Sequence, residues 1–286
     1  MIRTLRVICL SKCNLDCVYC CHEGYVTRSV HLSASKIASF CRYLQEHCGT
    51  NRVKLTGGEP LLCPDLTALV ETLSREQRYQ ISLVSNGTLT RKIEDLVVRT
   101  NRNVQLTISL PALDARIYDE ITRSTGQLPR VLETIELLVK QEFPLRLNVV
   151  LTSRNLGHVL SDPFLSFARF HRADLKFLQC VRNLTNEGLP HGMQLPLGDI
   201  LSAMRQLGFS LQGETRSSCR LVGNGLGITV VKSFCYPDCR TCPEDKTSLW
   251  LAGDGLLRSC VLVNRPDYRL VKWEPSEYDE ALEKLS

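Results

Sequence analysis

The stretch RTLRVICLSKCNLDCVYC, residues 3–20, joins an apolar run to three closely spaced cysteines. Residues 3–10 have the length and apolar content of a strand in a buried sheet. Cys13, Cys17 and Cys20 follow in a C-x3-C-x2-C spacing. Because a loop directly after a strand lies at the strand's carboxyl end, we expect these three thiols at the mouth of a sheet.

Five similar apolar runs follow, and most are separated by stretches with helical periodicity. The predicted strands cover 3–10, 52–56, 79–85, 104–110, 144–152 and 173–181. The predicted helices cover 33–47, with Ser33 as the cap, and 64–76, 128–141, 160–171 and 196–208. Alternating strands and helices predict an α/β fold with a parallel sheet and right-handed crossovers. Six strands are too few for a closed barrel of eight, so we predict a partial (β/α)6 TIM-like barrel.

The alternation changes after about residue 182. A second C-x3-C-x2-C spacing appears in CYPDCRTC, residues 235–242, within a Gly- and Cys-rich region. Cys260 follows a predicted hairpin whose turn is GDG at 253–255. We therefore expect two parts, a barrel over 1–182 and a small Cys-rich α+β extension over 183–286.

The composition limits the cellular compartment and the classes of partner that we expect for the protein. The chain has 286 residues, a net charge of +5 and 14 cysteines. This charge is too modest to indicate a nucleic-acid partner and suits an anionic small molecule or a peptide. We find no secretory signal and no run near the ~18 apolar residues that span a membrane. We therefore expect a cytoplasmic protein, in which clustered cysteines are metal ligands rather than disulfides.

The number of thiols in the first set favours an iron–sulfur cluster over zinc. A structural zinc ion requires four ligands, whereas three thiolates can hold a cubane 4Fe–4S cluster and leave one iron open. An open iron at the mouth of a sheet is a functional arrangement. A closed structural site would be expected elsewhere.

The first cysteine set, with Tyr19 directly before its last cysteine, resembles the signature of the radical S-adenosylmethionine (SAM) enzymes. In that family the open iron binds the amino and carboxylate groups of SAM. The reduced cluster then cleaves the sulfonium and releases a 5′-deoxyadenosyl radical. The resemblance implies that Cys13, Cys17 and Cys20 hold this cluster and that Tyr19 lies near the adenine.

Further motifs agree with this resemblance in order and position. TGGEP at 56–60 follows the second strand, where Gly57 and Gly58 would let the backbone approach the methionine amino group and Glu59 would fix the turn. The resemblance implies further SAM contacts at the strand ends, namely Ser85, Asn86, Ser109 and Asn148. Taken alone, each of these polar residues is better explained as a strand-end residue that satisfies the backbone, and the SAM contacts are indicated by their joint order on successive strands.

The second cysteine set resembles the Twitch and SPASM auxiliary-cluster extensions of radical SAM enzymes, and most of all that of the GTP 3′,8-cyclase family. The resemblance implies a second 4Fe–4S cluster bound by Cys235, Cys239, Cys242 and Cys260. Three ligands would leave an iron open to the substrate, and four would close the cluster. Cys219 is a fifth candidate ligand, and a zinc ion with four thiolates is the alternative metal.

The departures from the cyclase family indicate a related enzyme with a changed substrate. That family has an Arg-rich strand after its cysteine pair and a Gly-Gly tail, whereas this chain has PEDKTSLWL and ends EALEKLS. Arg6, Lys54 and Lys176 fall where the family binds substrate phosphates, which implies a small anionic or nucleotide-like substrate. Ordinary salt-bridged basic residues are the alternative.

Three classes of function follow from these patterns. The first is an enzyme that abstracts hydrogen from a small substrate and receives electrons from a flavodoxin or ferredoxin. The second is a maturase that modifies a ribosomal peptide. The third is a non-catalytic iron–sulfur or zinc module, which the presence of the SAM-contacting motifs disfavours. The pattern does not identify a catalytic residue that acts on the substrate.

Overall fold

Six parallel strands form the centre of the fold. The computed structural model describes residues 2–20, 33–100, 104–180, 189–232, 247–260 and 267–285. The central strands are β1 (Thr4–Ile8), β2 (Arg52–Thr56), β3 (Gln80–Ser85), β4 (Val104–Ser109), β5 (Leu145–Leu151) and β6 (Asp174–Gln179). Neighbours along the chain are also neighbours in the sheet. All six predicted strands are confirmed within two residues of their predicted ends.

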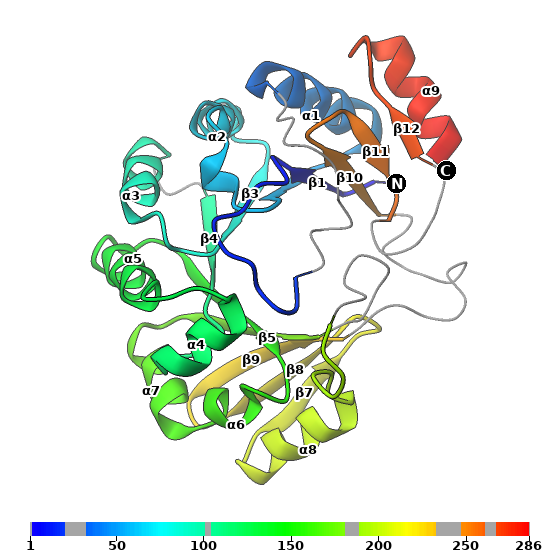
Figure 1. The fold of residues 1–286 in the computed structure, drawn as a ribbon. Coiled ribbons are helices and arrows are strands. Elements are labelled where there is room, and N and C mark those ends of the chain that lie inside the picture. The colour runs from blue at the N-terminus through cyan, green and yellow to red at the C-terminus, as the bar shows by residue number, and fades with distance from the viewer. Residues whose placement is uncertain are drawn as a thin grey trace.

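The helices pack along one side of this sheet, as the outer arc of Figure 1 shows. They are α1 (Ala34–Cys48), the 3-10 turn η2 (Pro60–Leu62), α2 (Leu66–Arg75), α3 (Thr90–Arg99), α4 (Ala115–Thr122), α5 (Leu128–Lys140), α6 (Leu156–Val159), α7 (Asp162–Phe170), α8 (Leu197–Gln206) and α9 (Pro275–Leu285). The Ser33 side chain accepts a hydrogen bond from the Lys36 backbone N–H, which confirms the predicted cap of α1. Gly49 ends α1 in the left-handed conformation.

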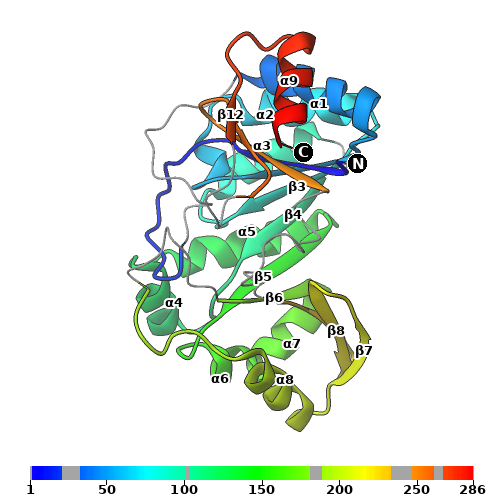
Figure 2. The same cartoon turned by 90° about the vertical axis from the view of Figure 1, so that its right-hand side faces the viewer.

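Strands from the predicted extension continue the sheet at both sides. They are β7 (Ser210–Glu214), β8 (Ser218–Gly223), β9 (Leu226–Val231), β10 (Ser248–Ala252), β11 (Leu256–Arg258) and β12 (Asp267–Arg269). The order of the 12 strands is β12-β11-β10-β1-β2-β3-β4-β5-β6-β9-β8-β7. β10 pairs parallel with β1, and β9 pairs parallel with β6. In the described part of the chain the sheet is open, which confirms a partial barrel, and Figure 2 shows its curvature from the side.

The predicted hairpin is also confirmed. β10 and β11 are antiparallel, with Trp250 opposite Arg258, and the GDG turn at 253–255 joins them. The boundary at residue 182 stays a prediction.

The two faces of the sheet carry different side chains because strand residues alternate in direction. Leu5, Val7, Val53 and Leu55 point to the helices and are fully buried in the main core. Arg6 and Lys54 alternate with them and lie on the opposite face, which we call the inner face. The sheet register places these two cations side by side.

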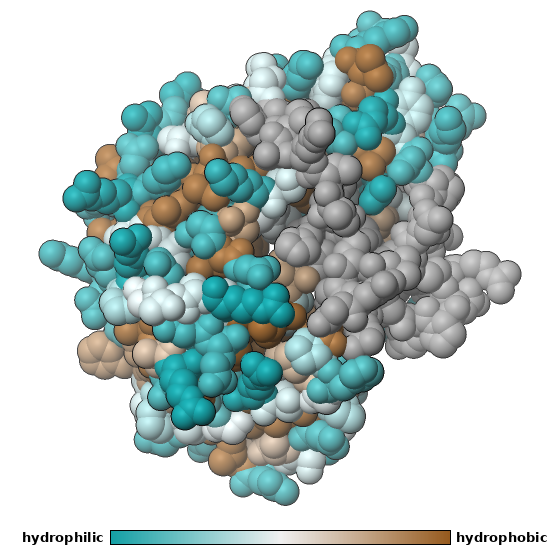
Figure 3. Space-filling model, in the orientation of Figure 1, coloured by the Kyte–Doolittle hydropathy of each residue, from teal (hydrophilic) through white to brown (hydrophobic). Residues whose placement is uncertain are grey.

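The outer surface has a mixed character. On the face drawn in Figure 3, hydrophobic residues are interspersed among hydrophilic ones over the described part of the chain. None of the described helices combines the length and the apolar content that a membrane span requires.

Candidate functional site

The glycine-rich turn after β2 packs directly on the segment that leads to the first cysteines. Gly58 N–H donates to the Leu10 carbonyl and Glu59 N–H to the Lys12 carbonyl, both at 2.9 Å. A Cβ at Gly58 would lie 2.2 Å from the Lys12 oxygen, and one at Gly57 would lie 2.4 Å from the Leu10 oxygen. Both glycines are therefore required by backbone packing in the protein itself. Their expected approach to SAM stays a prediction.

The other side of the cysteine loop is fastened to the end of α4. Val18 N–H donates to the Ile121 carbonyl at 2.9 Å, and Asp16 N–H donates to the Thr122 carbonyl at 3.2 Å. An ion pair of 3.1 Å joins Arg123 to the Asp16 carboxylate. Figure 1 shows the loop, in dark blue, running from β1 toward α4. Backbone hydrogen bonds on two sides thus fix the position of the loop.

Glu59 joins the glycine-rich turn to the loop after β3. Its carboxylate is fully buried and accepts hydrogen bonds from Ser85 Oγ at 2.9 Å, Asn86 N–H at 2.8 Å and Leu61 N–H at 3.1 Å. Burial raises the pKa of Glu59, while these hydrogen bonds oppose the rise. Three predicted site residues therefore form one polar unit, in which Glu59 and Ser85 are buried.

A second polar unit joins the loop after β3 to the cysteine loop. Asn86 Nδ2 donates to Asn14 Oδ1 at 2.8 Å and lies 3.8 Å from Cys13 Sγ as a hydrogen-bond donor. Thr88 Oγ1 donates to Asn86 Oδ1, and Asn14 Nδ2 donates to Thr88 Oγ1, each at 2.7 Å. Sequence reasoning missed Asn14 and Thr88. Their positions, one inside the C-x3-C spacing and one directly after SNG, were the available signal.

The three thiols lie close enough to influence one another. Burial, together with the neighbouring Cys20 and Cys13 thiols, raises the pKa of Cys17 to about 12. Burial also raises the pKa of Cys13. Among the described residues, no three His, Cys, Asp or Glu side chains converge on a single metal-ion position.

Tyr19 lies over the inner face rather than in solvent. Burial is the main cause of the raised pKa of Tyr19, and the neighbouring Cys17 and Cys20 thiols add to the rise. Together with Val18 and Val150, Tyr19 packs on a small apolar cluster that is separate from the main core and comprises Cys180, Leu189 and Met193. This packing covers the cysteine loop with apolar side chains.

Polar residues on the last central strands also meet on the inner face. Ser109 of β4 pairs with Asn148 of β5, and Asn148 pairs with Lys176 of β6. The Asn148 Oδ1 atom is buried and has no hydrogen-bond partner among the described residues. Because buried acceptors are almost always satisfied, this oxygen fits a site that receives a ligand donor.

At the other side of the inner face, Trp250 lies next to the cation Arg6. The Arg6 guanidinium lies 4.9 Å from the centre of the Trp250 ring. The register Trp250–Arg6–Lys54 runs across β10, β1 and β2. Trp250 packs with Ile8 of β1 in a cluster distinct from the main core. Sequence reasoning missed Trp250, although it lies on the strand where the cyclase family is Arg-rich.

The second cysteine set is described only in part. Cys235, Cys239 and Cys242 lie outside the described residues. Cys260 is half-buried and lies two residues after the end of β11. Cys219 is fully buried in β8 as part of the main core.

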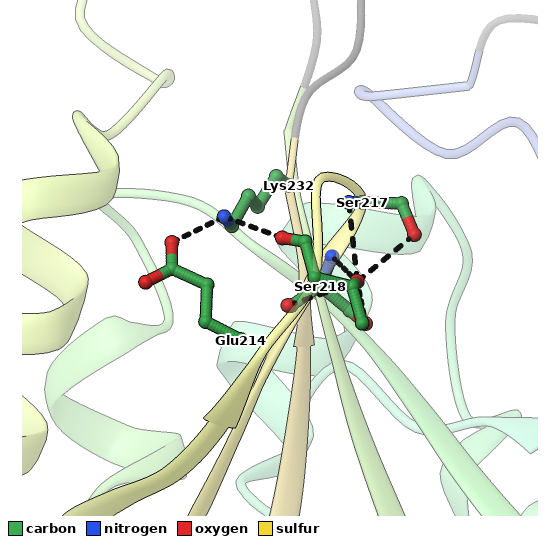
Figure 4. Close-up of polar contacts among 5 residues, drawn as sticks. Glu214, Ser217, Ser218 and Lys232 are labelled. Atoms are coloured by element: carbon green, nitrogen blue, oxygen red, sulfur yellow. Dashed lines mark hydrogen bonds and ion pairs between the residues drawn. The ribbon is translucent and has the colours of Figure 1, made fainter. Parts of the chain in front are cut away.

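The residue directly before the segment that carries those cysteines is held by an ion pair and hydrogen bonds. Lys232, the residue before it, forms an ion pair with Glu214 and donates to the Thr215 carbonyl at 2.8 Å (Figure 4). Its backbone N–H donates to the Ser217 carbonyl at 3.0 Å. The end of β9 is thereby tied to the β7–β8 connection.

Comparisons with known proteins agree with this geometry. The family model described as the Radical SAM superfamily matches residues 7–160. The chain belongs to the radical SAM superfamily. This stretch contains the first cysteine set, the glycine-rich turn and the strand-end polar residues. The superfamily assignment makes the protein an enzyme with a 4Fe–4S cluster and SAM as its cofactors.

Curated relatives are similar along most of the chain. A probable GTP 3′,8-cyclase of Methanopyrus kandleri is 30% identical over 266 residues, which is 91% of this chain and 82% of the relative. A GTP 3′,8-cyclase of Listeria welshimeri is 30% identical over 90% of this chain and 78% of the relative.

Solved structures share the fold of this radical SAM enzyme. SuiB of Streptococcus suis bound to S-adenosylmethionine has a TM-score of 0.74 and 15% identity, and covers 94% of this chain. The chain spans 63% of SuiB. The structure titled native anSMEcpe with bound AdoMet has a TM-score of 0.65 and 17% identity over 100% of this chain and 80% of that one.

Proposed function

We propose that this radical SAM enzyme reductively cleaves SAM at a cluster held by Cys13, Cys17 and Cys20. The resulting radical abstracts hydrogen from a small anionic or nucleotide-like substrate on the inner face, near an auxiliary 4Fe–4S cluster in residues 183–286. The observation that carries this substrate class is the inner face itself. Arg6, Lys54 and Lys176 give this face of the partial barrel a positive charge, which suits an anionic substrate.

The chain's own residues fit the first cofactor pair. When bound, a 4Fe–4S cluster supplies the electron that cleaves SAM. Cys13, Cys17 and Cys20 hold the cluster on a loop whose position is already fixed by hydrogen bonds. The orphaned Asn148 oxygen accepts a donor from the bound ligand. Tyr19 and its apolar neighbours exclude water from this end of the barrel.

The residues that we assign to substrate binding lie on the same face, within the strands rather than at their ends. Arg6 and Lys54 are one strand apart, and Lys176 lies across the sheet on β6. We assign these three cations to the anionic part of the substrate. The Arg6 guanidinium lies over the Trp250 ring, and this contact orients the cation.

The strand directions support two clusters on either side of this substrate. The first cysteine loop leaves the carboxyl end of β1. β11 runs antiparallel to β10, which is parallel to β1, so Cys260 follows at the amino end of β1. Arg6 lies in the middle of β1, between these two ends. Cys235, Cys239 and Cys242 complete the proposed auxiliary cluster with Cys260.

The direct test is anaerobic reconstitution with iron and sulfide, followed by addition of dithionite and SAM. We expect 5′-deoxyadenosine, measured by chromatography and mass spectrometry. Its absence from preparations with intact clusters and candidate substrates would contradict the proposed function. Iron analysis tests the cluster number, since replacing Cys13, Cys17 and Cys20 by alanine should remove about half of the iron. Loss of all or none of the iron would contradict two clusters.

A peptide substrate is the second candidate. One similar solved structure is titled as SuiB bound to precursor peptide SuiA, with a TM-score of 0.70 and 15% identity. If this chain is a maturase, then SAM cleavage coupled to substrate should respond to peptides and not to nucleotides. Incubation with each class, followed by mass spectrometry of the substrate, separates the two candidates.

A further inference from the structure

Cys13 differs from an ordinary exposed thiol because two N–H groups approach its sulfur. Leu15 N–H lies 3.4 Å from Cys13 Sγ, and Asn86 Nδ2 lies 3.8 Å from it. The first donor belongs to the cysteine loop itself. The second comes from the loop after β3, 73 residues away along the chain. A side chain from a different element can therefore act on this ligand.

The orientation of the Asn86 amide is determined by its surroundings. Thr88 N–H donates to Asn86 Oδ1 at 3.0 Å, and this contact requires an oxygen at that position. The amide nitrogen must then face the cysteine loop, where Asn14 Oδ1 accepts one of its hydrogens at 2.8 Å. The second hydrogen is available to Cys13 Sγ. The backbone N–H of Asn86 is held separately by Glu59 at 2.8 Å.

We propose that Asn86 tunes the first cluster by donating a hydrogen bond to the Cys13 ligand, an inference that rests on the proposed function. A donor to a thiolate ligand stabilises negative charge on the cluster. The reduced cluster carries one more negative charge than the oxidised cluster, so the donor favours reduction. Asn86 is thus a positioning and tuning residue that acts through Cys13. Asn14 and Thr88 keep its amide in place.

The reduction potential of the intact holoenzyme tests this role. We would follow the EPR signal that changes when SAM is added, since that signal belongs to the cluster at the first cysteine set. In Asn86→Ala the equilibrium constant for reduction should fall about three- to tenfold, the scale of one net hydrogen bond. In Asn86→Asp it should fall at least as far, because a carboxylate replaces the donor. Both variants keep the backbone contact to Glu59.

Thr90→Ala is the matched control. Thr90 follows the same loop, and its hydroxyl contacts the Arg130 carbonyl and the Thr134 hydroxyl rather than Cys13. The reduction potential of the cluster in this variant should stay at the wild-type value. Wild-type potentials in both Asn86 variants, or equal shifts in Thr90→Ala and Asn86→Ala, would overturn the proposal. Failure of the proposed function would be recognised separately, as a wild-type enzyme with an intact cluster that forms no 5′-deoxyadenosine.

Discussion

The two faces of the sheet are built from the same strands but carry different kinds of side chain. On the helix-covered face, every second residue of β1 and β2 is fully buried in the main core. On the inner face, Arg6 of β1 and Lys54 of β2 alternate with these core residues and are half-buried cations. Because a strand residue contributes to only one face, stability and chemistry can be changed almost independently. Adjacent residues such as Lys54 and Leu55 therefore provide a direct test of this separation.

The largest effect is expected for the thiols at the mouth of the sheet. Cys13→Ala should reduce 5′-deoxyadenosine formation to the background of the unloaded protein, because the cluster loses a ligand. Far-UV circular dichroism and the midpoint of urea unfolding, measured on the unloaded protein, should be nearly unchanged. The loop is held by backbone hydrogen bonds that the substitution leaves in place. Wild-type activity in this variant would rule out Cys13 as a ligand.

A core substitution should show the opposite pattern. Leu55→Ala removes a fully buried side chain and should lower the free energy of unfolding by about 2–5 kcal/mol, measured by urea denaturation. When Leu55→Ala is assayed at a low temperature at which it remains folded, it should still form 5′-deoxyadenosine. If it lost the cleavage reaction while folded, the proposed separation of the two faces would be wrong.

The neighbouring inner-face cation provides the matched comparison. Lys54→Met should change the free energy of unfolding by less than about 1 kcal/mol. It should weaken binding of GTP, used as an anionic nucleotide probe, about tenfold, which is about 1.4 kcal/mol. Equilibrium dialysis measures this affinity. If the wild-type enzyme did not bind GTP or other anionic nucleotides, a nucleotide-like substrate would be excluded.

The smallest effect is expected at the C-terminal helix α9, which carries none of the proposed cluster ligands. The buried Glu277 carboxylate accepts hydrogen bonds from Val271 N–H and Trp273 N–H, each at 2.7 Å. Burial acts to raise the pKa of Glu277, but these backbone donors outweigh it and the pKa is lowered overall. Glu277→Gln should lower the free energy of unfolding by about 1 kcal/mol at neutral pH.

The pH dependence follows from the direction of that shift. A lowered folded-state pKa gives a stabilising contribution that is complete above the ordinary carboxyl pKa. This contribution is lost as the pH falls through the folded-state value. The difference in unfolding free energy between the wild type and Glu277→Gln should therefore shrink below about pH 4.5. A difference that grows on acidification would contradict this assignment.

Local patterns predicted the strands, the cap at Ser33 and the hairpin at 253–255, because each depends on residues that are close in sequence. The order of the cysteine and glycine-rich motifs predicted the superfamily. The positions of β9 and β10 in the sheet were not predictable in this way, since they depend on pairing with β6 and β1.

The polar contacts of the site could not be predicted from local patterns either. Glu59, Ser85 and Asn86 were named individually from their motifs, but their mutual hydrogen bonds depend on the packing of two strands. Trp250 was missed because its role depends on the neighbouring strand that carries Arg6. A single sequence gives no direct information about such neighbours.

The pairing of β1 with β10 has a consequence for the assembly of the enzyme. Thr4 pairs with Ser248, which lies 244 residues later in the chain. The strand that leads into the radical-generating loop therefore lacks its neighbour on one side until β10 has been synthesised. Loading of iron and sulfide into a complete barrel must then follow the synthesis of β10. A truncated chain that retains every ligand of the first cluster would leave one side of β1 exposed.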